Sequence, residues 1–264
     1  MEFPNRGFDR KVNDRPGGAR VNYIDSSSLK RPFNMPLAVV GIAVVFVLVA
    51  GVIGFVFWDK IYSSIILKPQ QELESTQQNI SKSVPLELPL LTGFVHLDAN
   101  GVINKFNEAS YNFYDLNKLS GTDSAGMDVL KLPEGVSGVD AALAYGTGLS
   151  SISSSEAVRM LNGSWRFTVA SNNFTEMRLR YADFHSGSIE AAIKYAIEQE
   201  GWNDAQFGES GTDSAGNTFQ EGTVVVNGAT YGWRVSACPL PDVYSIKGVP
   251  DTSVYVGIRV FLGS

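Results

Sequence analysis

The sequence predicts an α+β fold: an antiparallel β-sheet with helices packed on one face, carried behind a single N-terminal transmembrane helix and a stalk. Three observations lead to this prediction. An uncharged apolar run fills residues 32–58, pairs of short alternating apolar segments flank turn sequences such as Asn-Gly, and apolar residues recur at helical spacing in 188–200. With 264 residues, 44% of them hydrophobic, the chain can bury a core. Hairpins that are separate from helices favour the α+β class.

The segment 32–58 is expected to cross a membrane. It contains no charged residue, and its apolar run extends from Pro36 to Trp58. A helix of this length measures about 40 Å, more than the roughly 30 Å of hydrocarbon in a bilayer. A cleaved signal peptide is the alternative, but small residues should then follow an apolar region of about 7–15 residues. Phe55, Phe57 and Trp58 occupy that place instead, so we expect an uncleaved anchor.

The flanking charges predict how this anchor is oriented. Residues 1–31 have the composition of a flexible tail, and basic residues outnumber acidic ones up to the start of the apolar run. The positive-inside rule then places this tail in the cytoplasm and the acidic C-terminal part outside it, in the cell envelope. The acidic balance argues against a nucleic-acid partner. The single cysteine, Cys238, excludes an internal disulfide bond.

Within the membrane segment, Ala50 and Gly54 form a pair of small residues four positions apart, and Ala43 lies one heptad earlier on the same side. Small residues let two membrane helices approach closely. A homodimer through the membrane helix is therefore one expectation.

Residues 59–89 are expected to form a stalk. Pro69 suits the first turn of a helix, and the glutamines and glutamates that follow are compatible with an exposed helix. Pro85 and Pro89 would end it. The exported domain is therefore expected to span 90–264.

The first half of this domain is predicted to contain one hairpin and one helix. Two apolar runs in 94–106 surround Asp98-Ala99-Asn100-Gly101, which favours a β-hairpin. Asn107 would then cap a helix over 108–119. Residues 127–160 indicate mixed helix and loop.

The second half is predicted to contain two hairpins, a helix and a final strand. Residues 164–170 and 176–184 would pair as a hairpin, and Ser188 would cap a helix that stops at Gly201. Strands on either side of Asn227-Gly228 form the third predicted hairpin. The alternating residues 253–262 predict the last strand.

The heptapeptide Ser-Gly-Thr-Asp-Ser-Ala-Gly occurs twice, at 120–126 and 210–216. A nucleophile elbow needs glycine two residues before the serine, but Thr122 and Thr212 stand there. The residues that flank the two copies are not the same. We therefore interpret the copies as two turns and not as a duplicated domain. No catalytic residue is assigned; the loop candidates are Asp123, Ser124, Asp213 and Ser214.

No metal or cofactor site is predicted. His96 and His185 have no histidine or cysteine at ligand spacing, and the Asp98 loop lacks the glutamate that calcium loops carry at the twelfth position. The glycosylation acceptor pattern occurs at Asn79, Asn162 and Asn173.

Two parts of the domain resemble a PAS or Cache-type sensor domain. Residues 93–110, GFVHLDANGVINKFNEAS, are similar to its opening hairpin and first helix, and residues 224–240 with 254–261 are similar to its closing strands. The resemblance implies a role in sensing a ligand or a partner.

These features together predict a single-pass membrane protein whose exported domain binds or senses a ligand or assembles with another protein, without catalytic activity. An envelope protein is the expected partner. Two alternatives stay open: a scaffold subunit of an envelope secretion or conjugation-type machine, and an envelope hydrolase that uses the serines of the heptapeptides.

Overall fold

The computed structural model describes residues 60, 62–117, 126–169 and 176–262, except for the side chains of 63, 65, 66 and 204. The expected tail 1–31 and membrane segment 32–58, with Pro36, Ala43, Ala50, Gly54 and Trp58, lie outside the described residues. Within the part that is described, no helix has both the length and the apolar character needed to cross a membrane.

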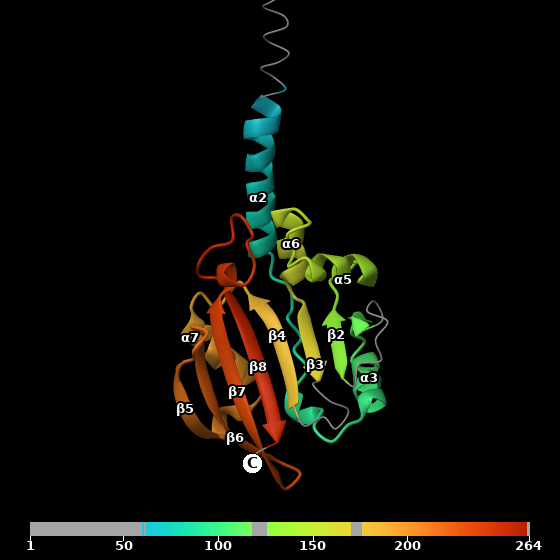
Figure 1. Cartoon of the computed structure of the whole chain (residues 1–264), viewed down its shortest axis with the longest axis vertical. Helices are drawn as coiled ribbons and strands as arrows, with labels where there is room; N and C mark the ends of the chain where they lie inside the picture. The colour runs from blue at the N-terminus through green and yellow to red at the C-terminus, as the bar shows by residue number, and fades with distance from the viewer. Residues whose placement is uncertain (1–59, 61, 118–125, 170–175, 263–264) are drawn as a thin grey trace, which may run out of the picture. The chain divides into compact units, whose positions relative to one another are not determined.

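The described residues form one eight-stranded antiparallel sheet and five α-helices (Figure 1). This confirms the α+β class and the antiparallel sheet. The strands are β1 (Phe113–Asp115), β2 (Met127–Lys131), β3 (Trp165–Val169), β4 (Glu176–Asp183), β5 (Gln206–Thr212), β6 (Thr218–Val226), β7 (Ala229–Pro239) and β8 (Val254–Leu262). The helices are α2 (Lys68–Ser81), α3 (Ala99–Glu108), α5 (Gly138–Gly146), α6 (Ser154–Leu161) and α7 (Ile189–Gln199).

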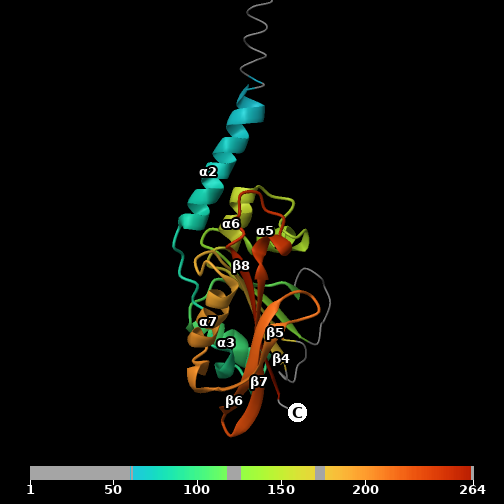
Figure 2. The same cartoon turned by 90° about the vertical axis from the view of Figure 1, so that its left-hand side faces the viewer.

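The sheet consists of two four-stranded meanders that meet at its centre. Its strand order is β1-β2-β3-β4-β8-β7-β6-β5, so the last strands of the two meanders, β4 and β8, pair with each other from Glu176↔Phe261 to Asp183↔Val254. Helix α7 connects β4 in the centre to β5 at the far edge (Figures 1 and 2). Each meander is thus preceded by a helix, α3 or α7.

The repeated heptapeptide occupies the same place in both meanders. Asp98 caps α3 and Ser188 caps α7, and the interval between these caps along the chain equals the interval between Ser120 and Ser210, where the two copies begin. In the sequence, the first copy lies between β1 and β2, and the second begins in β5 and ends before β6. The interpretation as a turn is confirmed for the end of the second copy, where the Gly216 N–H donates to the Asp213 carbonyl at 3.0 Å between β5 and β6. For the first copy it stays a prediction, because residues 118–125 lie outside the described residues.

Helices α3 and α7 cover one face of the sheet, and the main core lies beneath them (Figure 2). In β3 the buried residues alternate with partly exposed ones, which brings Trp165 and Phe167 to this face. Phe106 of α3 packs against both, with its ring centroid 5.3 Å from that of Trp165 and 5.4 Å from that of Phe167. On the other meander, Trp202 stacks on Trp233 at 4.9 Å.

The prediction that all helices pack on one face is wrong for α5 and α6. Alternate residues of a strand point to opposite faces, so Ala182 of β4 lies on the opposite face from Leu179. Ala182 nevertheless clusters with Met160 and Leu161 of α6. These two helices, with residues of the segment between β7 and β8 such as Leu240, therefore cover the second face at the end of the sheet nearest α2 (Figure 1).

The hairpin predicted over 94–106 is also wrong. Residues Leu91–Gly93 form a 3-10 turn, and α3 begins directly after Asp98, whose carboxylate accepts a hydrogen bond from the Gly101 N–H at 2.7 Å. Val102 and Phe106, four residues apart, are buried on one side of the helix. The segment that resembles the opening hairpin of a PAS domain is therefore helical. The helix predicted over 108–119 is wrong too, because β1 lies there.

The mixed helix and loop predicted over 127–160 is confirmed for α5 and α6 but wrong for 127–131, where β2 lies. The local predictions for the second half of the domain are confirmed. Strands β3 and β4 pair, as do β6 and β7, and β8 ends the described chain. Asn227 and Gly228 have φ values of 51° and 81°, as the tight turn between β6 and β7 requires. The Ser188 hydroxyl accepts a hydrogen bond from the Ala191 N–H, and α7 ends before Gly201.

The helix predicted to open at Pro69 is confirmed as α2, and its C-terminal half is docked on the domain. The stalk over 59–89 stays a prediction. Asn79 donates to the Ser155 carbonyl at 2.9 Å, and Asn162 donates to the Asn79 carbonyl at 2.8 Å. The folded unit therefore extends N-terminally beyond Leu90. Because these contacts use the amide nitrogens of Asn79 and Asn162, two of the three glycosylation patterns have a structural role here; the third, at Asn173, lies outside the described residues.

Candidate functional site

The second face of the sheet carries a row of arginines. In cross-strand register, Arg178 of β4 lies opposite Arg259 of β8, and Arg259 lies opposite Arg234 of β7. All three alternate with buried residues, so they are on the face opposite α7. Like charges directly opposite each other destabilise a sheet, so this row needs carboxylates beside it.

Glu176 provides the first of these carboxylates. It accepts hydrogen bonds from Arg178 Nε at 2.6 Å and from Arg259 Nη2 at 2.8 Å. Partial burial works to raise the pKa of Glu176, but the hydrogen bonds and charges of the two arginines together outweigh it and hold the pKa below its ordinary value. Glu176 is therefore ionised at neutral pH and is shared by two guanidinium groups.

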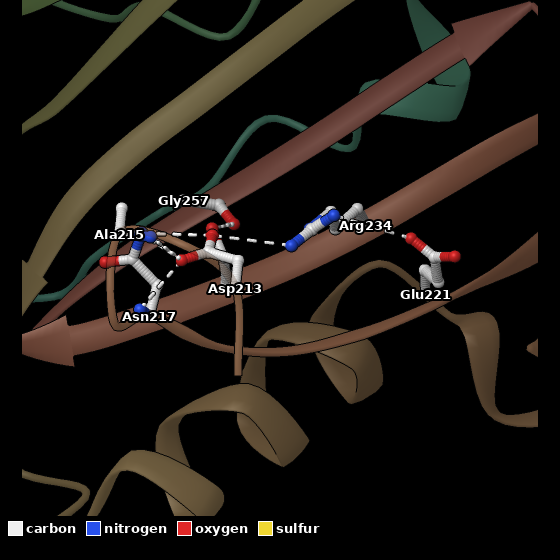
Figure 3. Close-up of polar contacts among 7 residues, drawn as sticks. Asp213, Ala215, Asn217, Glu221, Arg234 and Gly257 are labelled. Carbon is white, nitrogen blue, oxygen red and sulfur yellow. Dashed lines mark hydrogen bonds and ion pairs between the residues drawn. The ribbon is translucent and has the colours of Figure 1, made fainter. Parts of the chain in front are cut away.

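Arg234 is held by two further carboxylates and an aromatic ring. Its guanidinium lies 3.4 Å from Asp213 and 3.7 Å from Glu221 (Figure 3). The same guanidinium lies 3.7 Å from the centre of the Phe219 ring, within the range of a cation–π contact. These contacts fix Arg234 at the edge of the row.

Asp213 belongs to the second heptapeptide, whose residues 213–216 lie in the turn between β5 and β6. Its carboxylate accepts hydrogen bonds from the Ala215 N–H at 3.0 Å and from the backbone and side chain of Asn217 at 2.9 and 3.1 Å (Figure 3). The hydrogen bonds from Asn217, and then those from Ala215 and the charge of Arg234, keep the pKa of Asp213 below its ordinary value. Ser214 is exposed and makes no hydrogen bond to a histidine or lysine within the described residues.

Arg180 differs from the other arginines of this face. It lies opposite Arg166 of β3 and Gly257 of β8. Arg166 is neutralised by Asp128, which accepts from its Nε at 2.7 Å and its Nη2 at 2.6 Å. The Arg180 side chain, half-buried, makes no ion pair or hydrogen bond with any described residue.

These residues surround a cavity of about 540 Å³, which we call the arginine hollow. Gly257 forms its floor between Arg180 and Ser236; a Cβ atom there would come within 3.3 Å of Ser236 Oγ. At the end away from the arginine row, the hollow is bordered by less polar groups. Two of the loop candidates, Asp213 and Ser214, border the hollow. Its full lining is Arg178, Arg180, Asp213, Ser214, Asn217, Arg234, Ser236, Ala237, Cys238, Val243, Tyr255, Gly257, Ile258 and Arg259.

The geometry of the hollow suits the binding of an anion. Guanidinium groups donate planar pairs of hydrogen bonds to carboxylates and phosphates, and a cavity of this size matches small-molecule sites. Burial, followed by the negative charges of Asp242 and Asp213, raises the pKa of the Cys238 thiol, so this group stays protonated at neutral pH.

The other residues singled out by the sequence do not join this site. His96 is not in a strand but in a turn with φ 72°, and its Nε2 atom lies 2.9 Å from the Tyr231 hydroxyl. His185 follows β4, where its N–H donates to Asp183. Asp123 and Ser124 lie outside the described residues. Across the described ranges, no three histidine, cysteine, aspartate or glutamate side chains gather as metal ligands would.

Sequence reasoning did not single out the arginines of the hollow. Arg178 and Arg180 alternate with apolar residues in β4, and this pattern places them on the outward face of a strand. Outward charged residues are ordinary in exposed strands. Only the pairing of β8 with both β4 and β7 brings the four arginines together.

No family model matches the chain, and no curated protein or solved structure shows a significant match to it.

Proposed function

We propose that this chain is a non-catalytic binding protein that holds a small anionic ligand in the arginine hollow and displays it outside the cytoplasm on a single membrane anchor. One observation carries the proposal: Arg180 lies in a cavity among three other arginines and has no carboxylate partner within the described residues. A guanidinium group is costly to desolvate without a partner. An anion in the hollow would supply that partner.

A sensing role is supported by the position of the segment 240–253. Val243 borders the hollow, and five residues later the Gly248 carbonyl accepts a hydrogen bond from Gln77 of α2 at 3.0 Å. The Leu73 side chain of α2 lies close to Gly248 as well. The ligand site and the helix that leads to the anchor thus contact the same segment, through which a bound ligand would affect an envelope partner.

The proposal is tested by measuring anion binding to the full chain in lipid nanodiscs. Isothermal titration with acetate, hexanoate, inorganic phosphate and hexyl phosphate should yield saturable binding of at least one of them. Arg180→Gln should weaken that binding about 10- to 100-fold, because a hydrogen bond to a charged group contributes about 1.5–3 kcal/mol.

Lys194→Gln is the matched control. It removes the same charge from the exposed surface of α7, where Lys194 lies 3.7 Å from Glu198, on the covered side of the sheet. This variant should bind as the unaltered protein does. Absence of binding for every anion, or equal losses in both variants, would refute the proposal.

A further inference from the structure

The charges around the hollow determine how much negative charge a ligand should carry. This inference rests on the proposed function. Four arginines line the hollow. Three carboxylates lie against them: Glu176 between Arg178 and Arg259, and Asp213 and Glu221 on Arg234. The Arg166–Asp128 pair next to Arg180 is neutral by itself. Among the described residues, one positive charge therefore remains unbalanced at the arginine end.

The opposite end of the hollow is unsuited to a second negative group. Tyr255, Val243 and Cys238 border it. The negative charge of Asp242 reaches the Cys238 thiol and contributes to its raised pKa. A second anionic group placed there would be repelled by Asp242, whereas an apolar group would lie against the Val243 and Tyr255 side chains.

We infer that the arginine hollow binds a monoanionic carboxylate with an apolar body, its carboxylate on Arg180 and its body directed toward Tyr255 and Val243. The planar guanidinium matches a carboxylate with two parallel hydrogen bonds. A phosphate monoester, with a charge of about −2 at pH 7.5, would leave a surplus negative charge in the site. The volume of about 540 Å³ leaves room for a body well beyond the size of acetate.

A set of six-carbon probes tests this inference on the full chain in nanodiscs. At pH 7.5, hexanoate should bind at least tenfold more tightly than hexyl phosphate, hexanedioate and hexan-1-ol. It should also bind at least tenfold more tightly than acetate, because acetate lacks the apolar body. Titrating the Arg180→Gln variant in parallel corrects for partition into lipid.

Changing one bordering carboxylate should reverse the charge preference. Glu176→Gln keeps one of the two oxygens that accept from Arg178 and Arg259 and replaces the other with an amide group. It leaves two positive charges without a described carboxylate, so hexyl phosphate should gain at least fivefold relative to hexanoate. Glu198→Gln on α7 makes the same charge change on the other face and should leave the ratio unaltered. If the Glu176→Gln variant unfolds, Glu221→Gln tests the same change in the affinity of hexyl phosphate relative to hexanoate.

The outcomes separate this inference from the proposed function. If unaltered protein binds hexyl phosphate or hexanedioate as tightly as hexanoate, the site binds anions but the inference of a monoanionic carboxylate is wrong. If hexan-1-ol binds as tightly as hexanoate, the carboxylate has no role. If none of the probes binds, the proposed function itself fails.

Discussion

Glu200, at the end of α7, should make the stability of this protein fall as the pH rises. The residue is 5% exposed, and one of its carboxylate oxygens accepts a hydrogen bond from the Leu91 N–H at 2.9 Å. The other oxygen has no hydrogen-bond partner within the described residues. Burial raises the pKa of Glu200 to about 8, although the N–H groups of Leu91 and Thr92 lower it in part.

The sign and size of the effect follow from this shift. Between the ordinary pKa of 4.5 and the folded pKa of about 8, the folded chain keeps the Glu200 proton and the unfolded chain releases it. The free energy of unfolding therefore decreases by about 1.4 kcal/mol per pH unit in this window. From about pH 5 to about pH 8 the loss is on the order of 4 kcal/mol. Groups with lowered pKa, such as Glu176, act around and below pH 4.5 and do not mask it.

Urea unfolding in mild detergent, followed by tryptophan fluorescence across this pH range, measures the effect. The stacked pair Trp202 and Trp233 provides the signal. Glu200→Gln, which keeps an acceptor for the Leu91 N–H without a charge, should flatten the pH dependence and be the more stable protein at about pH 8. A steep loss of stability that persists in the variant, or an unaltered protein that gains stability toward pH 8, would refute this reasoning.

Two further substitutions test local features of the fold. Ser188→Ala removes the hydroxyl that accepts from the Ala191 N–H and should cost about 1 kcal/mol of stability in the same urea assay; no loss would mean that this cap is not used. Gly222→Ala should cost at least about 2 kcal/mol, because a Cβ atom at this position would overlap the Gln206 carbonyl and the Trp233 ring, and a neutral result would contradict the described pairing of β5 with β6.

The parts of the fold that could be predicted from sequence are those with a decisive local signal. Ser188 before an amphipathic run specifies the start of α7, and Asn227-Gly228 can adopt the positive φ values of a tight turn. The Asp98 segment was ambiguous, because aspartate followed by glycine suits both a turn and a helix cap. The helix forms because Val102 and Phe106 then bury one face against rings of β3, far along the chain.

The candidate site could not be predicted for a related reason. Each arginine of the hollow is an ordinary outward residue of its own strand, and only the β4–β8 and β7–β8 registers bring them together. Pairing between distant strands is not encoded in any short stretch of sequence.

Protection of Cys238 from alkylation tests the central claim most directly. This residue borders the arginine hollow and is the single cysteine of the chain, so its reaction with N-ethylmaleimide reports on the hollow alone. We expect hexanoate at ten times its dissociation constant to slow the reaction about tenfold in the unaltered protein, because about a tenth of the sites stay empty. The same concentration should slow the reaction in Arg180→Gln by no more than about twofold, because a 10- to 100-fold weaker site is at most about half occupied. An alkylation rate that hexanoate does not alter at concentrations that saturate binding would place the ligand elsewhere and contradict the account.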